Sequence, residues 1–253
     1  MNQNKKLPKG WEWAKLGDLI EMQSGVAFKK SEYTKEGIKL FQIANVSFNY
    51  TKWDDIEYLP NDYIDKYPHL LLNEGDIVMA LNRPLLNNQL KIAELKVNDI
   101  PAMLYQRVGR FSFDERLDKK YFLYYFQSPV FLKWLGDQLQ GVNIPFINKS
   151  KLFNYNYFPL PSSIELQKEI VSKIEELFSE LDKGIEDLKI AQQQLKIYRQ
   201  SVLKWAFEGK FTNEKIKGGI FPKNWKLIKF SEAVTLSFYA QTNLVTNGDF
   251  ETW

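Results

Sequence analysis

The chain has 253 residues, of which 44% are hydrophobic and 26% charged, so it is long enough to bury a core in one or two globular domains. It contains no cysteine, which excludes disulfides, thiol catalysis and cysteine-ligated metals. Its net charge of only +3 excludes the uniformly positive surface of a nonspecific nucleic-acid binder, so any DNA-binding groups have to be gathered on one face. We find no apolar run of the ~20 residues that a membrane helix needs and no signal peptide, and we expect a cytoplasmic protein without membrane contact.

Residues 1–160 predict a mixed α/β domain of the α+β class. Apolar segments such as Ile38–Phe48 and Gly75–Leu81 are rich in branched or aromatic residues and bounded by Gly, Asn or Asp, as strands are. Asp118–Leu139 has apolar residues at helical spacing and predicts a helix that breaks near Ser128-Pro129, followed by a second helix. Most of the aromatic residues are expected to form the core of this domain.

A long helix is predicted to follow. The prolines of "FPLPSS" end the first domain, and Ser162 or Ser163 can cap a helix from Ile164 to about Phe207. Such a helix is roughly 66 Å long, which exceeds what a domain of this size can cover. We therefore expect residues 161–210 to act as a spacer that pairs with another helix, and an amphipathic helix lying on its own domain is the alternative.

The pairing surface follows from heptads in this helix. Apolar residues recur every seven positions in two rows offset by three, which is typical of a coiled coil. Two small residues in the middle of the seam would let paired helices approach closely. The predicted dimerisation seam consists of Ile170, Ile174, Leu177, Leu181, Gly184, Leu188, Ala191, Leu195, Tyr198, Val202 and Trp205.

The chain repeats its own beginning near its end. The segment from Leu7 reads "LPKGWEWAKLGDLI", and the segment from Phe221 reads "FPKNWKLIKFSEAV" at an offset of 214 residues. Residues 211–253 therefore contain a linker followed by a repeat of the chain's opening segment. The last stretch, residues 239–253, does not continue that pattern, and we have no physical account of it.

Three segments together resemble the specificity subunit of type I restriction–modification systems. They are "LPKGWEWAKLGD", "NEGDIVMA" and, most specifically, "PLPSSIELQKEIV" from Pro159, where the family joins its DNA-recognition domain to a long helix. Ser162-Ser163 stand where the family has Pro-Leu, and Leu166 stands where Glu is usual. The resemblance covers about residues 7–230.

This resemblance implies a function. Full-length subunits of the family have two target-recognition domains, each reading half of a split DNA sequence, and two long helices that pair antiparallel. They perform no chemistry and need no cofactor. They hold two methyltransferase (M) subunits, which use S-adenosylmethionine, and these recruit motor–nuclease (R) subunits. We therefore expect residues 1–160 to be one target-recognition domain and residues 211–253 an incomplete second one. The expected protein is a half-length or truncated form that binds double-stranded DNA as a homodimer.

Candidate DNA contacts come from segments free of acidic residues, because a carboxylate would repel phosphate and base edges are read by Asn, Gln, Arg and Lys. Five such windows occur in the first domain: residues 22–31, 37–53, 77–93, 100–113 and 138–164. The polar loop "NRPLLNNQLK" in the third is the strongest candidate, and an ordinary solvated hairpin is its alternative. The predicted DNA-contacting residues are Lys29, Lys30, Asn45, Ser47, Asn82, Arg83, Asn87, Asn88, Gln89, Lys91, Gln106, Arg107, Arg110, Asn143, Asn148 and Lys149.

The sequence gives weaker support to other functions. "NIPF" from Asn143 only partly matches the motif by which adenine methyltransferases hold a flipped base, and Asp76 with Glu94 and Lys96 loosely matches the spacing of metal-dependent nucleases. The single histidine, His69, has no partner cysteine or second histidine nearby in sequence. The remaining rival is a truncated assembly or inhibitory subunit that binds methyltransferase without reading DNA.

Overall fold

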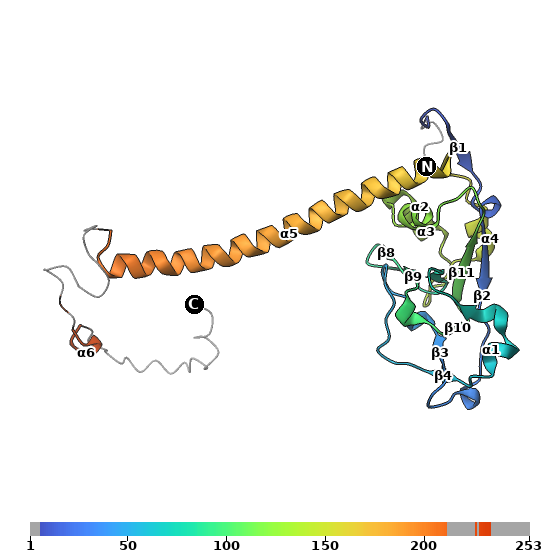
Figure 1. The fold of residues 1–253 in the computed structure, drawn as a ribbon, viewed down its shortest axis with the longest axis horizontal. Coiled ribbons are helices and arrows are strands. Elements are labelled where there is room, and N and C mark those ends of the chain that lie inside the picture. Colours follow the sequence, from blue (N-terminus) through green and yellow to red (C-terminus); the bar gives the residue numbers. More distant parts are fainter. Residues whose placement is uncertain (1–5, 212–225, 227, 234–253) are drawn as a thin grey trace. The chain divides into compact units, whose positions relative to one another are not determined.

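The computed structural model describes residues 6–211, 226 and 228–233. The chain divides into two compact units, residues 1–180 and 181–253. The first unit contains two four-stranded sheets with short helices beside them, which confirms the predicted mixed α/β class (Figure 1). Across the described residues, no helix combines the length and apolar character of a membrane span.

The first sheet is antiparallel throughout and has the order β2-β11-β6-β9. Its internal strand β6 is buried on both faces, because Ile77 and Met79 pack into one core cluster while Val78 and Ala80 pack into the other. This two-sided burial explains why the strand is a continuous apolar run instead of an alternating one. The strands are β2 (Ile20–Ser24), β11 (Val108–Phe113), β6 (Ile77–Ala80) and β9 (Ile92–Glu94).

The second sheet has the order β4-β3-β10-β5, in which β3 and β10 are parallel. Its inner residues share a core cluster with one face of β6 and β9, so the two sheets pack together. A separate hairpin, β7–β8, follows β6 in the chain. The strands are β4 (Tyr58–Leu59), β3 (Ile38–Phe41), β10 (Ala102–Leu104), β5 (Leu71–Leu72), β7 (Leu85–Leu86) and β8 (Gln89–Leu90).

The two ends of this domain are joined by a short ladder. Strand β1 (Trp11–Ala14) pairs antiparallel with β12 (Phe158–Pro161), so the segment that precedes the long helix closes on the beginning of the chain. Short helical turns complete the fold between strands. They are η1 (Leu16–Asp18), η2 (Lys30–Glu32), η3 (Ile43–Asn45), α1 (Tyr63–Lys66), η4 (Pro68–Leu70), η5 (Val97–Asp99) and α4 (Lys149–Phe153).

The helix break expected near Ser128-Pro129 is present. Helix α2 (Lys119–Phe126) ends before it, and α3 (Pro129–Gln138) begins after it, with the Ser128 hydroxyl accepting a hydrogen bond from the Phe131 amide at 3.3 Å. Both helices cover the face of the first sheet that holds the aromatic core. Phe122, Phe126 and Phe131 are fully buried there, with ring centroids 3.9 Å apart along the row.

Helix α5 spans Ile164–Phe207, the limits that the sequence predicted. In its first turns Gln167 and Val171 are buried against the first domain, so the first compact unit runs past residue 160, the predicted end of that domain. From residue 175 to residue 200 every side chain is exposed. The apolar seam is thus open along most of its length, and its pairing with a second helix stays a prediction.

The repeat near the end of the chain has a local structural counterpart. The Asp18 amide donates to the Lys15 carbonyl at 3.0 Å, and 214 residues later the Glu232 amide donates to the Lys229 carbonyl at 2.9 Å. The second turn begins helix α6 (Phe230–Ala233), as the first forms η1. The rest of the predicted second domain start, residues 212–225, 227 and 234–253, lies outside the described residues.

Candidate nucleic-acid interface

Three strands of the first sheet bring polar loops to one edge. Because β2 and β6 both run antiparallel to β11, their carboxyl ends meet the beginning of β11. Backbone hydrogen bonds connect the segments beyond the strands: Gln106 donates to the Val26 carbonyl at 3.0 Å, and Leu81 donates to the Arg107 carbonyl at 2.8 Å. Three of the acid-free windows, far apart in the sequence, therefore meet here.

A fourth window joins the same edge through the loop between α3 and α4. Gln140 and Phe146 pair across this loop, with their amides donating to one another's carbonyls at 2.9 and 2.8 Å. The Arg83 amide donates to the Pro145 carbonyl at 2.6 Å, and the Arg83 guanidinium lies 3.4 Å from the Asn143 carbonyl. We call the combined surface of residues 25–28, 81–83, 105–107 and 143–146 the recognition edge.

The recognition edge carries exposed basic and amide groups. Arg83, Arg107 and Asn143 are exposed, and Asn82 and Gln106 are half-buried beside them. Arg83 and Arg107 adopt left-handed backbone conformations with φ of 47° and 66°. Such a conformation costs about 1–2 kcal/mol for a residue other than glycine, and strain of this kind concentrates at functional sites. The fold thus holds two arginines in place at a cost to its own stability.

Some predicted contacts have structural roles instead. Asn45 and Ser47 are 3% and 7% exposed, and the Asn45 side chain accepts from the Gln42 amide at 2.7 Å and donates to the Lys52 carbonyl at 2.8 Å. The Arg110 guanidinium donates to the carbonyls of Leu71 and His69 at 2.8 and 3.1 Å. The Asn45 and Arg110 side chains are occupied by the protein's own backbone, and Ser47 is buried, so we leave all three out of the candidate interface.

Two further predicted residues belong to helix α4. The Asn148 side chain caps it by accepting from the Ser150 amide at 3.0 Å. The Lys149 ammonium donates to the Met22 carbonyl and lies 5.1 Å from the Phe153 ring centroid. Each has a structural partner, but both residues are exposed beside β2, unlike the buried Asn45 and the half-buried Arg110, so they stay candidate phosphate contacts.

The polar loop "NRPLLNNQLK" contains the hairpin that was its alternative reading. Asn87 and Asn88 form the two-residue turn between β7 and β8, with φ of 51° and 58°. A tight hairpin turn of this kind favours asparagine, so turn geometry by itself accounts for the pair. Their side chains and that of Gln89 are exposed, while Lys91 is half-buried. Lys29 and Lys30 are also exposed, at the start of η2, and stay candidate phosphate contacts.

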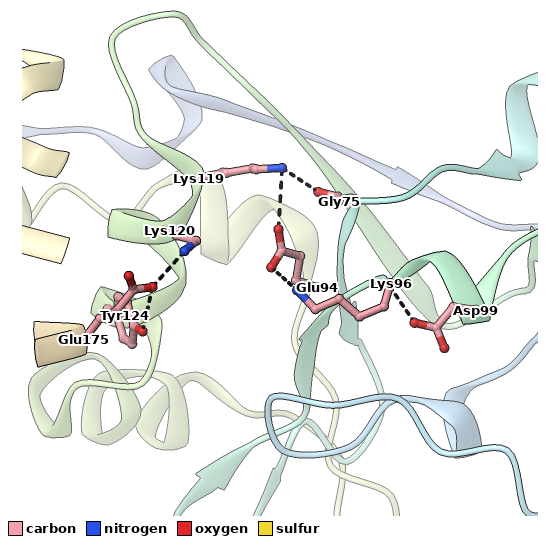
Figure 2. A network of polar contacts seen from close by, with 8 residues as sticks. All are labelled: Gly75, Glu94, Lys96, Asp99, Lys119, Lys120, Tyr124 and Glu175. Carbon is pink, nitrogen blue, oxygen red and sulfur yellow. Dashed lines mark hydrogen bonds and ion pairs between the residues drawn. The ribbon is translucent and has the colours of Figure 1, made fainter. Parts of the chain in front are cut away.

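The residues that loosely matched a nuclease form a network of ion pairs. Glu94 contacts the ammonium groups of Lys96 at 2.7 Å and Lys119 at 3.6 Å, and Asp76 lies 3.6 Å from the Arg110 guanidinium (Figure 2 shows the Glu94 contacts). Burial raises the pKa of the Glu94 carboxyl, but the two lysines outweigh burial and hold that pKa below its usual value. No group of three potential metal ligands occurs among the described residues.

Close packing at the recognition edge predicts the effect of one substitution. A Cβ atom on Gly25 would lie 2.4 Å from the Leu104 and Tyr105 carbonyl oxygens. We therefore expect Gly25→Ala to lower the free energy of unfolding by about 1–3 kcal/mol through overpacking, measured by urea denaturation. Gly136→Ala in α3 is the matched control, because its Cβ would meet only a Leu85 methyl at 3.7 Å. A loss in the control as large as that in Gly25→Ala would contradict this explanation.

Comparison with known proteins identifies the class of protein. Residues 8–189 match the family described as the type I restriction modification DNA specificity domain. The chain belongs to this family, which confirms the resemblance seen in the sequence. Its relatives are named as specificity subunits of type I restriction enzymes.

Two curated relatives share more sequence identity with this chain than unrelated proteins would. The chain is 38% identical over 206 residues to the type I restriction enzyme MjaVIII specificity subunit of Methanocaldococcus jannaschii, covering 81% of this chain and 47% of that protein. It is 34% identical over 189 residues to the EcoAI specificity subunit of Escherichia coli, covering 74% of this chain and 32% of that one. The chain thus spans about half the length, or less, of these relatives.

Solved structures agree on the fold. The HsdS subunit of Thermoanaerobacter tengcongensis superposes with a TM-score of 0.53 at 24% identity, covering 82% of this chain and 47% of that one. A chain from a type I R-M system, solved in a study of complex assembly and conformational transition, gives 0.55 at 21% identity, covering 83% and 48%.

Proposed function

We propose that this chain reads one half of a bipartite DNA target through its recognition edge. The observation that carries the proposal is the meeting of four acid-free segments at one sheet edge, with Arg83, Arg107 and Asn143 exposed on it. Arginine and asparagine make the bidentate contacts that distinguish guanine and adenine in the major groove. We assign Asn82 and Gln106 to the same surface.

Phosphate contacts would come from the residues around this edge. Phosphate contacts set the register of a protein on the duplex and need only positive or hydrogen-bonding groups. The exposed lysines beside β2 and the polar hairpin tip fit that role. We assign to it Lys29, Lys30, Asn87, Asn88, Gln89, Lys91, Asn148 and Lys149.

We further propose that two copies pair through α5, so that a dimer reads both halves of the target. The support is the open apolar seam, in which Leu188 is 72% exposed and Leu195 is 51% exposed. A closed two-fold dimer uses the same surface on both copies, which a continuous helix face supplies. Methyltransferase subunits would dock on the helix and the adjoining domain surface and bring motor–nuclease subunits with them, as expected from the family.

Selection from a randomised DNA pool tests this function, with the full chain and its cognate methyltransferase subunit. We expect enrichment of an inverted repeat separated by a gap of fixed length and free composition, because each copy reads one half-site. A roughly 66 Å helix corresponds to about 20 base pairs, the scale of gap it can define. Methyltransferase binding without any enriched sequence would overturn DNA reading and favour the truncated assembly subunit.

A further inference from the structure

The first turn of α5 is fixed to the recognition domain by one buried side chain. Gln167 is 0% exposed, and both ends of its amide are satisfied by backbone. Its Nε2 donates to the Arg116 carbonyl at 2.8 Å, and its Oε1 accepts from the Asp118 amide at 2.8 Å. The Asp118 side chain in turn caps α2 by accepting from the Lys120 and Tyr121 amides. The beginnings of α5 and α2 are therefore held together through a single amide group.

A second contact joins the same two helices further along. The Glu175 carboxylate lies 2.8 Å from the Lys120 ammonium and accepts from the Tyr124 hydroxyl at 3.3 Å (Figure 2). The hydrogen bond to Glu175 raises the pKa of Lys120 above its usual value. Both side chains are partly exposed, at 47% and 42%, so the ion pair adds little stability. It lies about 12 Å along the helix from Gln167 and so restricts the helix direction.

Helix α2 is itself tied to the sheet that carries the recognition edge. The Lys119 ammonium donates to the Gly75 carbonyl at 3.2 Å and lies 3.6 Å from the Glu94 carboxylate of β9 (Figure 2). Phe122 and Phe126 of the same helix pack on Phe111 of β11. A continuous path of contacts thus runs from the sheet through α2 to the start of α5.

Small errors at the start of a long helix become large at its far end. From Gln167 to Phe207 the helix extends roughly 60 Å, so a tilt of about 3° displaces its end by about 3 Å, close to the rise of one base pair. A sideways error of about 1 Å between the two contacts with α2 would tilt the helix by about 5°. A spacer that defines a gap to one base pair therefore needs its first turns fixed rigidly.

We propose that Gln167 is a positioning residue that fixes the direction of α5 relative to the recognition edge and thereby the number of base pairs between two half-sites. Its part in DNA spacing rests on the proposed function, but its part in fixing the helix does not. The sequence itself indicates that Gln167 has a special role. Gln167 stands seven residues before Ile174, where the heptad pattern calls for an apolar residue.

The first test measures helix direction without DNA. The chain has no native cysteine, so Lys133→Cys on α3 and Lys183→Cys on α5 give two unique spin-label sites, diluted with unlabelled chain to suppress distances between copies. We expect a narrow distance distribution for the unaltered sequence and a markedly broader one with Gln167→Met, which removes both hydrogen bonds at similar volume. Gln193→Met, an exposed glutamine on the same helix, should leave the distribution unchanged.

A second variant keeps the test decisive if Gln167→Met does not fold. Glu175→Ala removes only the partly exposed contact and should broaden the distribution less than Gln167→Met, while Glu175→Gln, which can still accept from Lys120, should restore much of it. Distributions as narrow in Gln167→Met or Glu175→Ala as in the unaltered sequence would overturn the positioning role.

The DNA selection then tests the consequence. With Gln167→Met we expect the same half-site bases but a several-fold weaker preference for one gap length over gaps one base pair longer or shorter. An unchanged gap preference would overturn the spacing role. If the unaltered chain enriches no sequence at all, the proposed function fails, while the spin-label result still decides whether Gln167 fixes the helix.

Discussion

Leu188→Asp is expected to leave the chain monomeric. Leu188 lies in the middle of the α5 seam and is 72% exposed in a single chain, so its apolar surface is available to a second copy. A carboxylate there would be buried without a partner on both copies, which costs far more than one lost contact. Sedimentation equilibrium should give the 29.8 kDa mass of one chain, whereas the unaltered sequence should give twice that mass.

The matched control for this variant is Gln193→Asp. It adds the same charge to the same exposed helix, but at the heptad position farthest from the seam, and should leave the dimer intact. Equal loss of pairing in both variants would show that charge, not position, matters. A Leu188→Asp chain that still sediments as a dimer would show that copies pair by another surface.

The amount of apolar surface exposed along the α5 seam favours a partner that covers most of the seam. Leu177, Leu181, Leu188 and Leu195 are each at least half exposed. Because each leucine is about half to three-quarters exposed, burying all four on two copies would contribute on the order of 7–14 kcal/mol at about 1.5–3 kcal/mol per fully exposed side chain. This is comparable to an association cost of about 4–15 kcal/mol. A methyltransferase subunit that covered only one stretch would leave the remaining leucines in water.

The regular elements could be predicted from the sequence because local signals specify them. The prolines and capping serines of "FPLPSS" marked the start of α5 at Ile164, and Ser128-Pro129 marked the break between α2 and α3. The hairpin turn at Asn87-Asn88 matches the alternative interpretation of the polar loop, and the same pair stays a candidate phosphate contact.

The candidate site was harder to predict from the sequence, because it depends on contacts between segments far apart in the chain. Acid-free windows identified the loops, but only the strand directions show that Val26, Arg83 and Arg107 reach one edge. Composition also does not distinguish a free polar group from an occupied one. Asn45 and Arg110 have the residue types that read DNA, yet their hydrogen bonds are made within the fold.

Arg107→Ala is expected to weaken DNA binding by about 1–3 kcal/mol and to relax the preference at one base position. Arg107 is exposed on the recognition edge, and alanine tolerates its left-handed backbone about as well as arginine does, so stability should change little. Arg83→Ala should act in the same way, with an added loosening of the loop that it holds through Asn143. Titrations against the selected sequence and against single-base variants of it measure both effects.

Arg110→Ala is the contrasting variant, because its guanidinium is bonded to the Leu71 and His69 carbonyls within the fold. It should lower the free energy of unfolding by about 1–3 kcal/mol while leaving base preferences unchanged. For Arg107→Ala, a uniform loss of affinity across all sequences, with the slope of log K against log salt smaller by about 1, would mark a phosphate contact. Unchanged affinity, base preference and salt slope in both Arg83→Ala and Arg107→Ala would place DNA recognition on another face of the domain.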